Sequence, residues 1–280
     1  MDLRCFRRAD NRATRQATAI LKVSIITAVR NGEATIATTL RSVQLQKYPD
    51  IEHIIIDGAS TDRTLEVVEA SGGGALRVLS EADRGVYDAF NKGLRLATGD
   101  VIAFLNSGDS YVSDAVVANM AAELNRTGVD AVFGDLVVVD ANDPRRVVRR
   151  YRSSRFRPSR VAYGFMPAHP TLFMRRRVYD DYGGYDASFR IAGDFELVAR
   201  VFARGRITYS CLADVLVRMP RGGLSTSGPR SNWTITREMQ RACRQNEIAT
   251  NIPKLLLRFP VKWTEFWGLR DLKVAAMSLD

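Results

Sequence analysis

Acidic and polar side chains follow the apolar segments of the first half of the chain in four places. These places are Thr27–Asn31, Asp57–Asp62, Glu81–Gly85 and Asn106–Asp109. A carboxylate can hold a divalent cation through its oxygens, and it can take a proton from a hydroxyl group that attacks a substrate. Both kinds of chemistry are open to this chain if its fold brings the four places together.

Two candidate aspartates stand in these segments. Asp57, in IIIDGASTDRT, can accept a hydrogen bond from a base N–H such as that of uracil, or it can cap the next helix together with Ser60. Asp109, in FLNSGDS, can bind Mg²⁺ or Mn²⁺ with only one or two protein ligands, because diphosphate oxygens and water complete the shell. Asn106 can add a side-chain oxygen and Gly108 allows close approach, although the same residues also suit a simple turn.

Three further candidates lie in the second half of the chain. Asp194, in IAGDFEL, begins a predicted helix, where the helix dipole favours a carboxylate whether it caps the helix or faces a cleft. Glu196 points elsewhere, so only one of this pair can readily face a cleft. His169, in AHPTLF, stands at the start of a predicted strand and suits a site, whereas His53 lies inside a strand and is expected to be structural.

Short apolar runs rich in β-branched residues predict the strands that would position these side chains. In the first half, strands are predicted at 23–29, 51–57, 75–80 and 101–105, and they alternate with segments of helical period. This alternation predicts βαβ units with right-handed crossovers, and hence an α/β fold with a mainly parallel sheet. Ligands of such sheets bind beyond the carboxyl ends of the strands, which is where all four polar segments fall.

Beyond residue 130 the pattern changes. Strands are predicted at 131–140, 169–176 and 207–219, a helix at 193–205, and an irregular loop or sheet edge in the Arg-rich stretch to about 160. We expect a flexible basic leader at 1–21, one domain at 22–220 and a helical C-terminal segment at 221–280.

The composition is that of an ordinary globular protein, since 46% of the 280 residues are hydrophobic and 26% are charged. It excludes a wholly disordered or collagen-like chain, and no apolar run is long enough for a membrane-spanning helix. The basic N-terminus lacks the apolar core of a secretory signal, so we expect a cytoplasmic protein. The three cysteines, at 5, 211 and 243, are too widely spaced for a disulfide framework or a metal knuckle.

The net charge of +10 is concentrated in one part of the chain. Residues 141–177 contain eleven arginines and one acid, Asp143, an excess that equals the charge of the whole chain. Such a block attracts anions, namely nucleic acid, an anionic membrane face or a phosphorylated substrate, or it is a solvated face. Because it contains no recognisable nucleic-acid module, we expect no nucleic-acid partner.

The order of motifs along residues 22–220 resembles glycosyltransferase family 2, the large inverting family with the GT-A fold. The motifs are VSIITAVRNGEATI, IIIDGASTDRT, ADRGVYDAFNKG, GDVIAFLNSGD, HPTLF and GDFEL. The most specific part is D-G-x-S-x-D-x-T, followed about forty residues later by L-N-S-G-D. The D-x-G-V-Y-D-A-x-N-K-G variant is most similar to bacterial enzymes that build exopolysaccharides, O-antigens or glycolipids.

By this resemblance the chain transfers a sugar from a nucleotide-sugar, with UDP favoured, and uses Mg²⁺ or Mn²⁺. The resemblance implies that Asp57 recognises the base, that Asp109 is the metal ligand and that Asp194 is the general base. It places the nucleotide-sugar beside Thr27, Val29, Asn31, Asp57, Asp83, Arg84, Asn91, Asn106 and Gly108. Glu196 is the reserve for the base, and we expect it and His169 on the acceptor or diphosphate side. Arg84 or the arginines at 175–177 are candidates to stabilise the leaving diphosphate.

The chain departs from the family pattern at three positions. Asn106 and Gly108 stand where acids are usual in the metal motif, which predicts weaker metal binding. Gly193 stands where a glutamate usually precedes the catalytic aspartate. With one base and no nucleophile on the enzyme, the predicted chemistry is a single displacement with inversion at the sugar.

The C-terminal residues 251–280 mix Leu, Phe and Trp with Lys and Arg. Trp263 and Trp267 would share a helix face, as in a helix that lies on an anionic membrane; the alternatives are a helix packed on the domain and a dimer contact. We expect a saccharide or a polyprenyl-linked acceptor, and a polyprenyl-diphosphate-linked one would explain both this segment and the arginine block. The protein would then be peripheral to the inner face of the cell membrane.

Three other functions fit part of the sequence. A nucleotidyltransferase shares the α/β plan, but it needs a Gly-rich basic phosphate loop after the first strand, where this chain has RNGEAT. The same residues exclude NAD and P-loop chemistry. A basic nucleic-acid-binding protein would share the charge, and an inactive scaffold of the same family is compatible with the altered metal motif.

Overall fold

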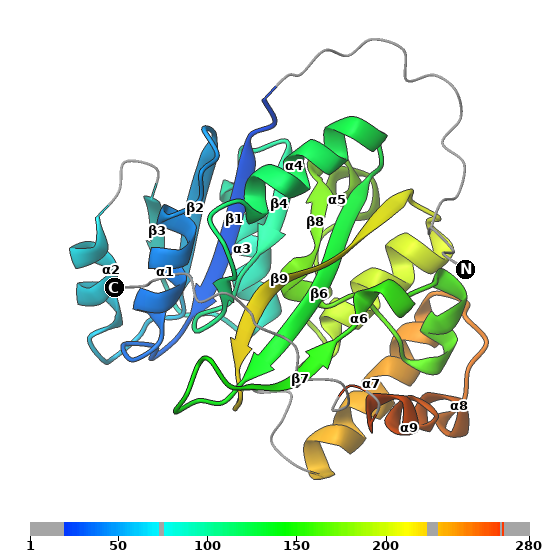
Figure 1. Cartoon of the computed structure of the whole chain (residues 1–280). Coiled ribbons are helices and arrows are strands. Elements are labelled where there is room, and N and C mark those ends of the chain that lie inside the picture. Colours follow the sequence, from blue (N-terminus) through cyan, green and yellow to red (C-terminus); the bar gives the residue numbers. More distant parts are fainter. Residues whose placement is uncertain (1–19, 73–75, 223–228, 264, 266–280) are drawn as a thin grey trace.

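The computed structural model describes residues 20–72, 76–222, 229–263 and 265. Within them a nine-stranded sheet runs through the molecule and helices cover both faces (Figure 1). The strands are β1 Val23–Val29, β2 Ile51–Asp57, β3 Leu76–Ser80, β4 Val101–Phe104, β5 Ser110–Tyr111, β6 Ala131–Val139, β7 Val147–Tyr151, β8 Phe173–Arg175 and β9 Tyr209–Pro220. The α-helices are α1 Ile36–Gln44, α2 Thr64–Ser71, α3 Val86–Leu96, α4 Val116–Thr127, α5 Arg176–Tyr182, α6 Gly193–Val198, α7 Pro229–Gln245, α8 Ile252–Leu256 and α9 Arg258–Trp263.

The first half of the sheet is parallel. β3, β2, β1 and β4 lie side by side in that order, and each crossover between successive strands contains one helix. Val29 is paired with Asp57, and Asp57 with Ser80, so β1, β2 and β3 end level with one another. The predicted α/β fold and mainly parallel sheet are confirmed, with β1 and β2 matching their predicted bounds to the residue.

The second half of the sheet mixes directions. β8 is antiparallel to β4 and β6, β6 is parallel to β9, and β7 pairs antiparallel with β6 as an edge in the Arg-rich stretch. The strand predicted at 169–176 was wrong at both ends. Residues His169–Thr171 form a 3₁₀ turn because Pro170 has no N–H for a ladder, and Arg176 already begins α5.

The helix predicted at 193–205 changes form along its length. α6 ends at Val198, and Ala199–Arg204 continue it as a π-helix. The apolar residues that the helical period of this segment places on one face, Phe195, Val198, Val201 and Phe202, are all buried. The pattern therefore identified the buried face correctly, although it gave no sign of the wider turn.

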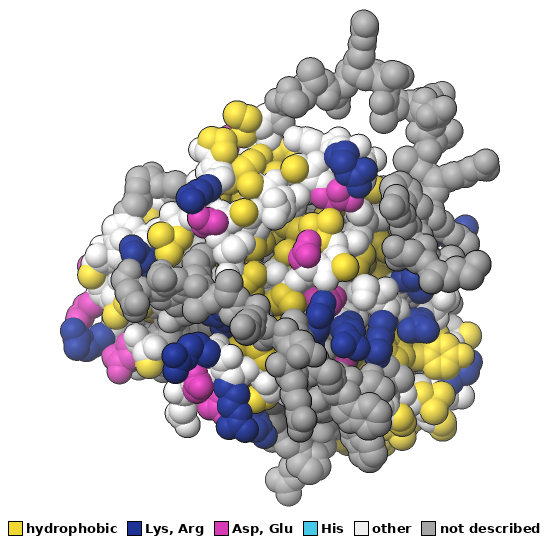
Figure 2. Space-filling view, viewed as in Figure 1, with side chains coloured by type: hydrophobic (Ala, Val, Ile, Leu, Met, Phe, Trp, Pro, Cys, Tyr) yellow, Lys and Arg dark blue, Asp and Glu magenta, His cyan; other side chains and the backbone are white. Residues whose placement is uncertain are grey.

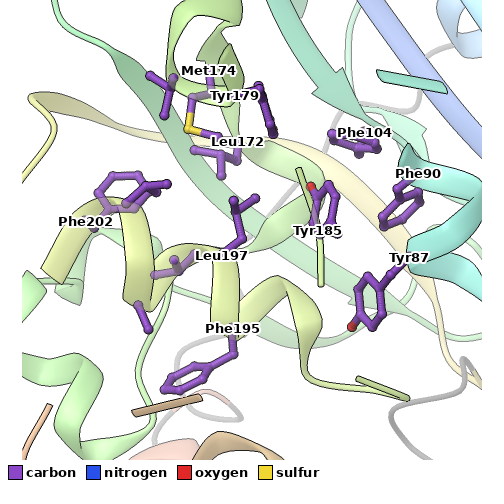
Figure 3. Packing of buried hydrophobic residues seen from close by; sticks show 14 of the residues in the cluster. Tyr87, Phe90, Phe104, Leu172, Met174, Tyr179, Tyr185, Phe195, Leu197 and Phe202 are labelled. Carbon is purple, nitrogen blue, oxygen red and sulfur yellow. The ribbon is translucent and has the colours of Figure 1, made fainter. Parts of the chain in front are cut away.

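Both faces of the sheet carry a core, because successive side chains of a strand point to opposite faces. Ile26 of β1 belongs to the cluster that contains α3 and α6, and Ile25 to the cluster that contains α4. This two-sided burial explains why β4 is a continuous apolar run and why β1 is nearly one. Aromatic rings dominate the first cluster, where Phe90, Phe104 and Tyr185 meet (Figure 3).

The C-terminal helices pack on the rest of the chain. α7 lies against α6 and buries Met239 and Cys243, and α8 lies against the 3₁₀ helix Pro158–Tyr163. Residues 1–19 of the predicted leader, with Cys5, lie outside the described residues, as do Trp267 and the side chain of Trp263.

None of the helices in the described ranges is both long enough and apolar enough to cross a bilayer.

Candidate active site

Hydrogen bonds tie together the loops that follow β1, β2 and β4. Asn31 adopts a left-handed φ of 52°; its Oδ1 accepts from the Thr61 N–H at 2.9 Å, and its own N–H donates to Ser60 Oγ at 2.8 Å. Thr39 of α1 accepts from the Gly108 N–H at 2.9 Å. The polar segments after these strands therefore converge on the carboxyl edge of the parallel strands, as the sequence predicted.

Asp57 ends β2 and is fully buried. Its carboxylate accepts hydrogen bonds from the Ser60 N–H at 3.0 Å, from Ser80 Oγ at 2.7 Å and from the Ser60 hydroxyl. The carboxylate thus organises the loop before α2, and it does so at the edge where a base would bind. Its role in recognising a base stays a prediction.

The loop after β3 meets the loop after β2 at a glycine. A Cβ on Gly58 would lie 2.3 Å from Asp83 Oδ2, so the absence of a side chain lets the two loops approach this closely. Lys92 of α3 supports the same loop from below, because its buried ammonium donates to the Ala82 carbonyl at 2.7 Å. The side chain of Arg84 is 84% exposed, which leaves it accessible to an anion.

Thr27 and Asn91, both predicted to border the nucleotide-sugar, use their polar groups inside the protein. The Thr27 hydroxyl donates to the Leu105 carbonyl at 2.7 Å. The Asn91 amide donates to the Tyr185 carbonyl and accepts from the Tyr185 N–H, at 2.8 Å each. Val29 is buried as well. The structure therefore gives all three a supporting place beneath the edge, and their contact with a nucleotide-sugar stays a prediction.

Two buried oxygen atoms in the turn after β4 have no hydrogen-bond partner among the described residues, namely Oδ2 of Asp109 and Oδ1 of Asn106. The turn is closed by the Asp109 N–H, which donates to the Asn106 carbonyl at 3.0 Å. Burial raises the pKa of Asp109 to about 8, because the site disfavours a bare negative charge. Hard oxygen ligands in a place that needs a positive charge fit a divalent cation.

Such a cation would take most of its ligands from outside the protein. Across the described ranges, no three His, Cys, Asp or Glu side chains gather in one place to hold a metal ion. Diphosphate oxygens and water can complete the shell of Mg²⁺ or Mn²⁺ around one carboxylate. The predicted site at Asp109 therefore fits a metal that arrives with its nucleotide.

Asp194 lies in the first turn of α6, next to α3. Its Oδ1 accepts from the Phe195 N–H at 2.8 Å and, more weakly, from the Tyr87 hydroxyl at 3.4 Å. Tyr87 belongs to the first turn of α3, which begins beyond the carboxyl end of β3, so this contact places Asp194 at the same edge as the strand-end loops. Burial raises the pKa of Asp194 to about 6, which places the titration of this carboxyl group close to neutral pH.

Asp194 and Glu196 have different surroundings, as their two-residue spacing predicted. Glu196 is buried, and both of its oxygens accept from the Arg200 guanidinium, at 3.0 and 2.9 Å. A Cβ on Gly193 would lie 2.8 Å from the Tyr87 ring, so this glycine makes room for Tyr87 beside Asp194. Asp194 is therefore the more accessible candidate of the two.

His169 belongs to an aromatic cluster that links it to Asp194. Its Nε2 lies 2.6 Å from the Tyr185 hydroxyl, and its ring stacks on Phe90 with the centroids 5.5 Å apart. Tyr185 stacks on Tyr87 at 5.7 Å between centroids (Figure 3). The Tyr87 hydroxyl in turn contacts Asp194. Burial lowers the pKa of His169 to about 4, so its ring is neutral near pH 7 and supports Tyr185.

The arginines at 175–177 lie at the opposite edge of the sheet. Arg175 is paired with Val101 at the start of β4, and Arg177 forms an ion pair with Asp130 at 2.6 Å. The prediction that they assist a leaving diphosphate was wrong, because the antiparallel β8 carries them away from the carboxyl edge of β4.

Comparisons with known proteins agree with this fold. The family model "Glycosyl transferase family 2" matches residues 24–183. A PGL/p-HBAD biosynthesis glycosyltransferase of Mycobacterium bovis (strain BCG) is 29% identical over 210 residues, covering 73% of this chain and 79% of that protein. S. aureus TarS 1–349 in complex with UDP-GlcNAc is similar in structure, with a TM-score of 0.64 and 20% identity over 88% of this chain and 73% of that one. The mannosyltransferase PcManGT from Pyrobaculum calidifontis, in complex with GDP-Man and Mn²⁺, has a TM-score of 0.58 and 19% identity. That match covers 88% of this chain and 81% of the mannosyltransferase.

Proposed function

Because this chain belongs to glycosyltransferase family 2, we propose that it transfers a sugar from a UDP-sugar to a hydroxyl group of a saccharide or lipid-linked acceptor, with inversion at the anomeric carbon. Its family, its GT-A fold and its class as a nucleotide-sugar-dependent transferase were predicted from the sequence and are confirmed. UDP as the nucleotide is supported by TarS, a structural neighbour that is described with UDP-GlcNAc.

One observation carries the proposal: the partly buried Asp194 carboxylate, with its raised pKa, stands at the sheet edge that also holds Asp109 Oδ2, which has no hydrogen-bond partner among the described residues. The first group suits a base that works near neutral pH. The second suits a cation that binds a diphosphate. An inverting sugar transfer can use both, because the new bond forms on one side of the anomeric carbon while the diphosphate leaves from the other.

In the proposed reaction the acceptor hydroxyl gives its proton to the Asp194 carboxylate while its oxygen bonds to the anomeric carbon. The bond between that carbon and the diphosphate oxygen breaks on the opposite side, and UDP leaves with the electron pair. A single displacement of this kind inverts the sugar. The Tyr87 hydroxyl contacts Asp194 Oδ1, and it would orient the carboxylate and favour its ionised form.

The strand-end loops would bind the donor. Asp109 and Asn106 would hold Mg²⁺ or Mn²⁺, which would stabilise the negative charge of the leaving diphosphate as a Lewis acid. The exposed guanidinium of Arg84 can approach the same phosphates. Asp57 and the Asn31 loop would contact the base and the ribose.

A thermal-shift panel of nucleotide-sugars tests this function. We expect a UDP-sugar with Mn²⁺ to raise the Tm of the protein by several degrees, because a ligand at 100 times its Kd stabilises the folded state by about 2.7 kcal/mol. Replacing Mn²⁺ with EDTA should shrink the shift. A panel without any shift would contradict the proposal, and so would turnover that releases pyrophosphate, the product of a nucleotidyltransferase.

The acceptor side of the proposal includes an anionic membrane surface. Leu256 and Leu257, at the end of α8, are 41% and 56% exposed, and Trp233 on α7 is 50% exposed. Because α8 packs against the 3₁₀ helix Pro158–Tyr163, its two exposed leucines lie in the same part of the molecule as the exposed Arg157 and Arg160. Figure 2 shows basic and hydrophobic side chains next to each other at the lower right of the view. Exposed apolar side chains beside arginines suit an interface with anionic lipid.

Removing the two leucines should weaken binding to such a surface. We expect the double variant Leu256→Ser/Leu257→Ser to float at least about tenfold less well with phosphatidylglycerol vesicles, because each leucine contributes on the order of 1 kcal/mol to partitioning. Val78→Ser, which removes an apolar side chain that is 46% exposed on β3, is the matched control. Equal recovery of the double variant and the wild type would exclude the end of α8 from membrane binding.

A further inference from the structure

A carboxylate from α7, the first of the C-terminal helices, holds the loop that leads to Asp194. Glu238 accepts three backbone hydrogen bonds at 2.8, 2.9 and 2.8 Å, from the N–H groups of Arg190, Ile191 and Ala192. We propose that Glu238 is a positioning residue of the transfer reaction, which fixes this loop so that Asp194 meets the acceptor hydroxyl. The inference rests on the proposed role of Asp194 as the general base.

The same loop is held from its other side by α3. The Tyr87 hydroxyl donates to the Ile191 carbonyl and also contacts Asp194 Oδ1. The backbone of Ile191 is therefore bound at its N–H by α7 and at its carbonyl by α3. A peptide held at both polar groups cannot rotate freely, and Asp194 follows only three residues later.

Two further contacts extend the hold of α7 along this segment. Arg241, one turn after Glu238, lies over the Phe189 ring at 3.6 Å from its centroid and donates to Ser188 Oγ at 2.9 Å. Asn246, just beyond α7, donates to Glu196 Oε1 at 3.2 Å. Contacts from this helix and its end thus lie before and after Asp194, which is the arrangement expected of a support for that residue.

The chemistry of the contact also favours positioning. Hydrogen bonds to an ionised acceptor are roughly twice as strong as neutral ones, and three of them converge on one side chain here. A displacement of about 1 Å at a reacting group can cost on the order of a hundredfold in rate. A loose loop before Asp194 would therefore reduce turnover even if the protein stayed folded and still bound its donor.

The charge of Glu238 has a second effect, which a purely structural contact would lack. Glu238 raises the pKa of Asp194, in addition to the larger effect of burial. Among the described residues, the hydroxyls of Tyr87, Tyr151 and Tyr185 also interact electrostatically with Asp194, and burial raises the pKa of each hydroxyl above its ordinary value. They stay neutral near pH 7, so replacing Glu238 with a neutral residue should lower the pKa of Asp194.

The test compares Glu238→Gln with Glu247→Gln in the full-length protein. Glutamine keeps the shape of the side chain, but it replaces one acceptor oxygen with an amide N–H₂ that cannot accept from the loop. For Glu238→Gln we expect kcat to fall at least about tenfold and donor Kd to stay within about twofold. The acid limb of the pH profile of kcat, near pH 6 in the wild type, should move to lower pH. Glu238→Asp, which keeps the charge, should recover part of kcat. Glu247→Gln should change none of these values, because the Glu247 side chain is 75% exposed and pairs with Arg204.

A measurement that does not depend on turnover keeps the two proposals apart. In Glu238→Gln, hydrogen exchange at the amides of residues 190–192 should be faster than in the wild type, whatever reaction the protein performs. If the wild type transfers no sugar but hydrogen exchange is faster in the variant, the proposed function is refuted. The structural contact between Glu238 and residues 190–192 would then stand without a role in transfer. A folded variant with unchanged kcat and an unmoved acid limb would overturn the positioning role, and so would unchanged exchange.

Discussion

Asp194→Asn should abolish sugar transfer while leaving the donor bound. Asparagine has nearly the same size as aspartate, but it cannot accept the proton of the acceptor hydroxyl. Because a positioned general base contributes about 10²–10⁴-fold to such reactions, we expect kcat to fall by about 10³-fold or more. The variant should still fold, since Asp194 Oδ1 accepts from the Phe195 N–H and an amide oxygen can do the same. UDP release with an acceptor present measures kcat, and calorimetry with a UDP-sugar measures donor Kd.

Asp181→Asn provides the control for this variant. Asp181 is an exposed residue of α5, so the same chemical change there should leave kcat and donor Kd at their wild-type values. If Asp194→Asn kept more than about a tenth of the wild-type kcat, Asp194 would not be the base. Glu196 would be a poor substitute, because both of its oxygens are already bound to Arg200.

Asp109→Ala should remove the part of donor binding that depends on a divalent cation. The variant lacks the carboxylate whose Oδ2 is buried without a partner in the described part of the chain. We expect Mn²⁺ to raise donor affinity at least about tenfold in the wild type and less than twofold in the variant, because losing one hydrogen-bonded or metal-bound charge costs at least about 1.4 kcal/mol. Calorimetric titrations of a UDP-sugar, with Mn²⁺ and with EDTA, measure this difference.

Stability gives Asp109→Ala a second signature. The substitution removes a buried carboxylate whose Oδ2 has no hydrogen-bond partner among the described residues, so it should not destabilise the protein in the absence of a ligand. The Tm of the variant with EDTA should match or exceed that of the wild type. Asp114→Asn is the control, because Asp114 forms a partly exposed ion pair with Lys47 at 2.7 Å. A wild type whose donor affinity is the same with Mn²⁺ and EDTA would show that the turn at Asp109 holds no metal.

The first half of the fold and its candidate residues could be predicted because they depend on local patterns. Each strand is a short apolar run, and the βαβ rule then sends every strand end to the same edge. Asp57 and the Asn106–Asp109 turn follow such ends directly, so their places were fixed by chain order alone. Gly193 was noticed only as a departure from a family pattern, and its reason, the Tyr87 ring, came from the structure.

The rest of the site depends on contacts between segments that are far apart in the chain. Tyr185 and Asn91 meet across 94 residues, and Glu238 meets the loop before Asp194 across 46 to 48. No periodicity or spacing in the sequence signals such pairs, because they arise from how α7 and the antiparallel half of the sheet pack on α3 and α6. The same applies to Arg175, which lies at the edge opposite the carboxyl ends of the parallel strands because β8 runs antiparallel to β4.

A crystal structure of the protein with a UDP-sugar and Mn²⁺ tests the central claim most directly. We predict an anomalous manganese peak at bonding distance from Asp109 Oδ2, about 2–2.5 Å, with the uracil against the Asp57 loop and the Asp194 carboxylate facing the anomeric carbon from the side opposite the diphosphate. A nucleotide bound away from the carboxyl ends of β1, β2 and β4, or an anomeric carbon that Asp194 cannot face, would contradict the account.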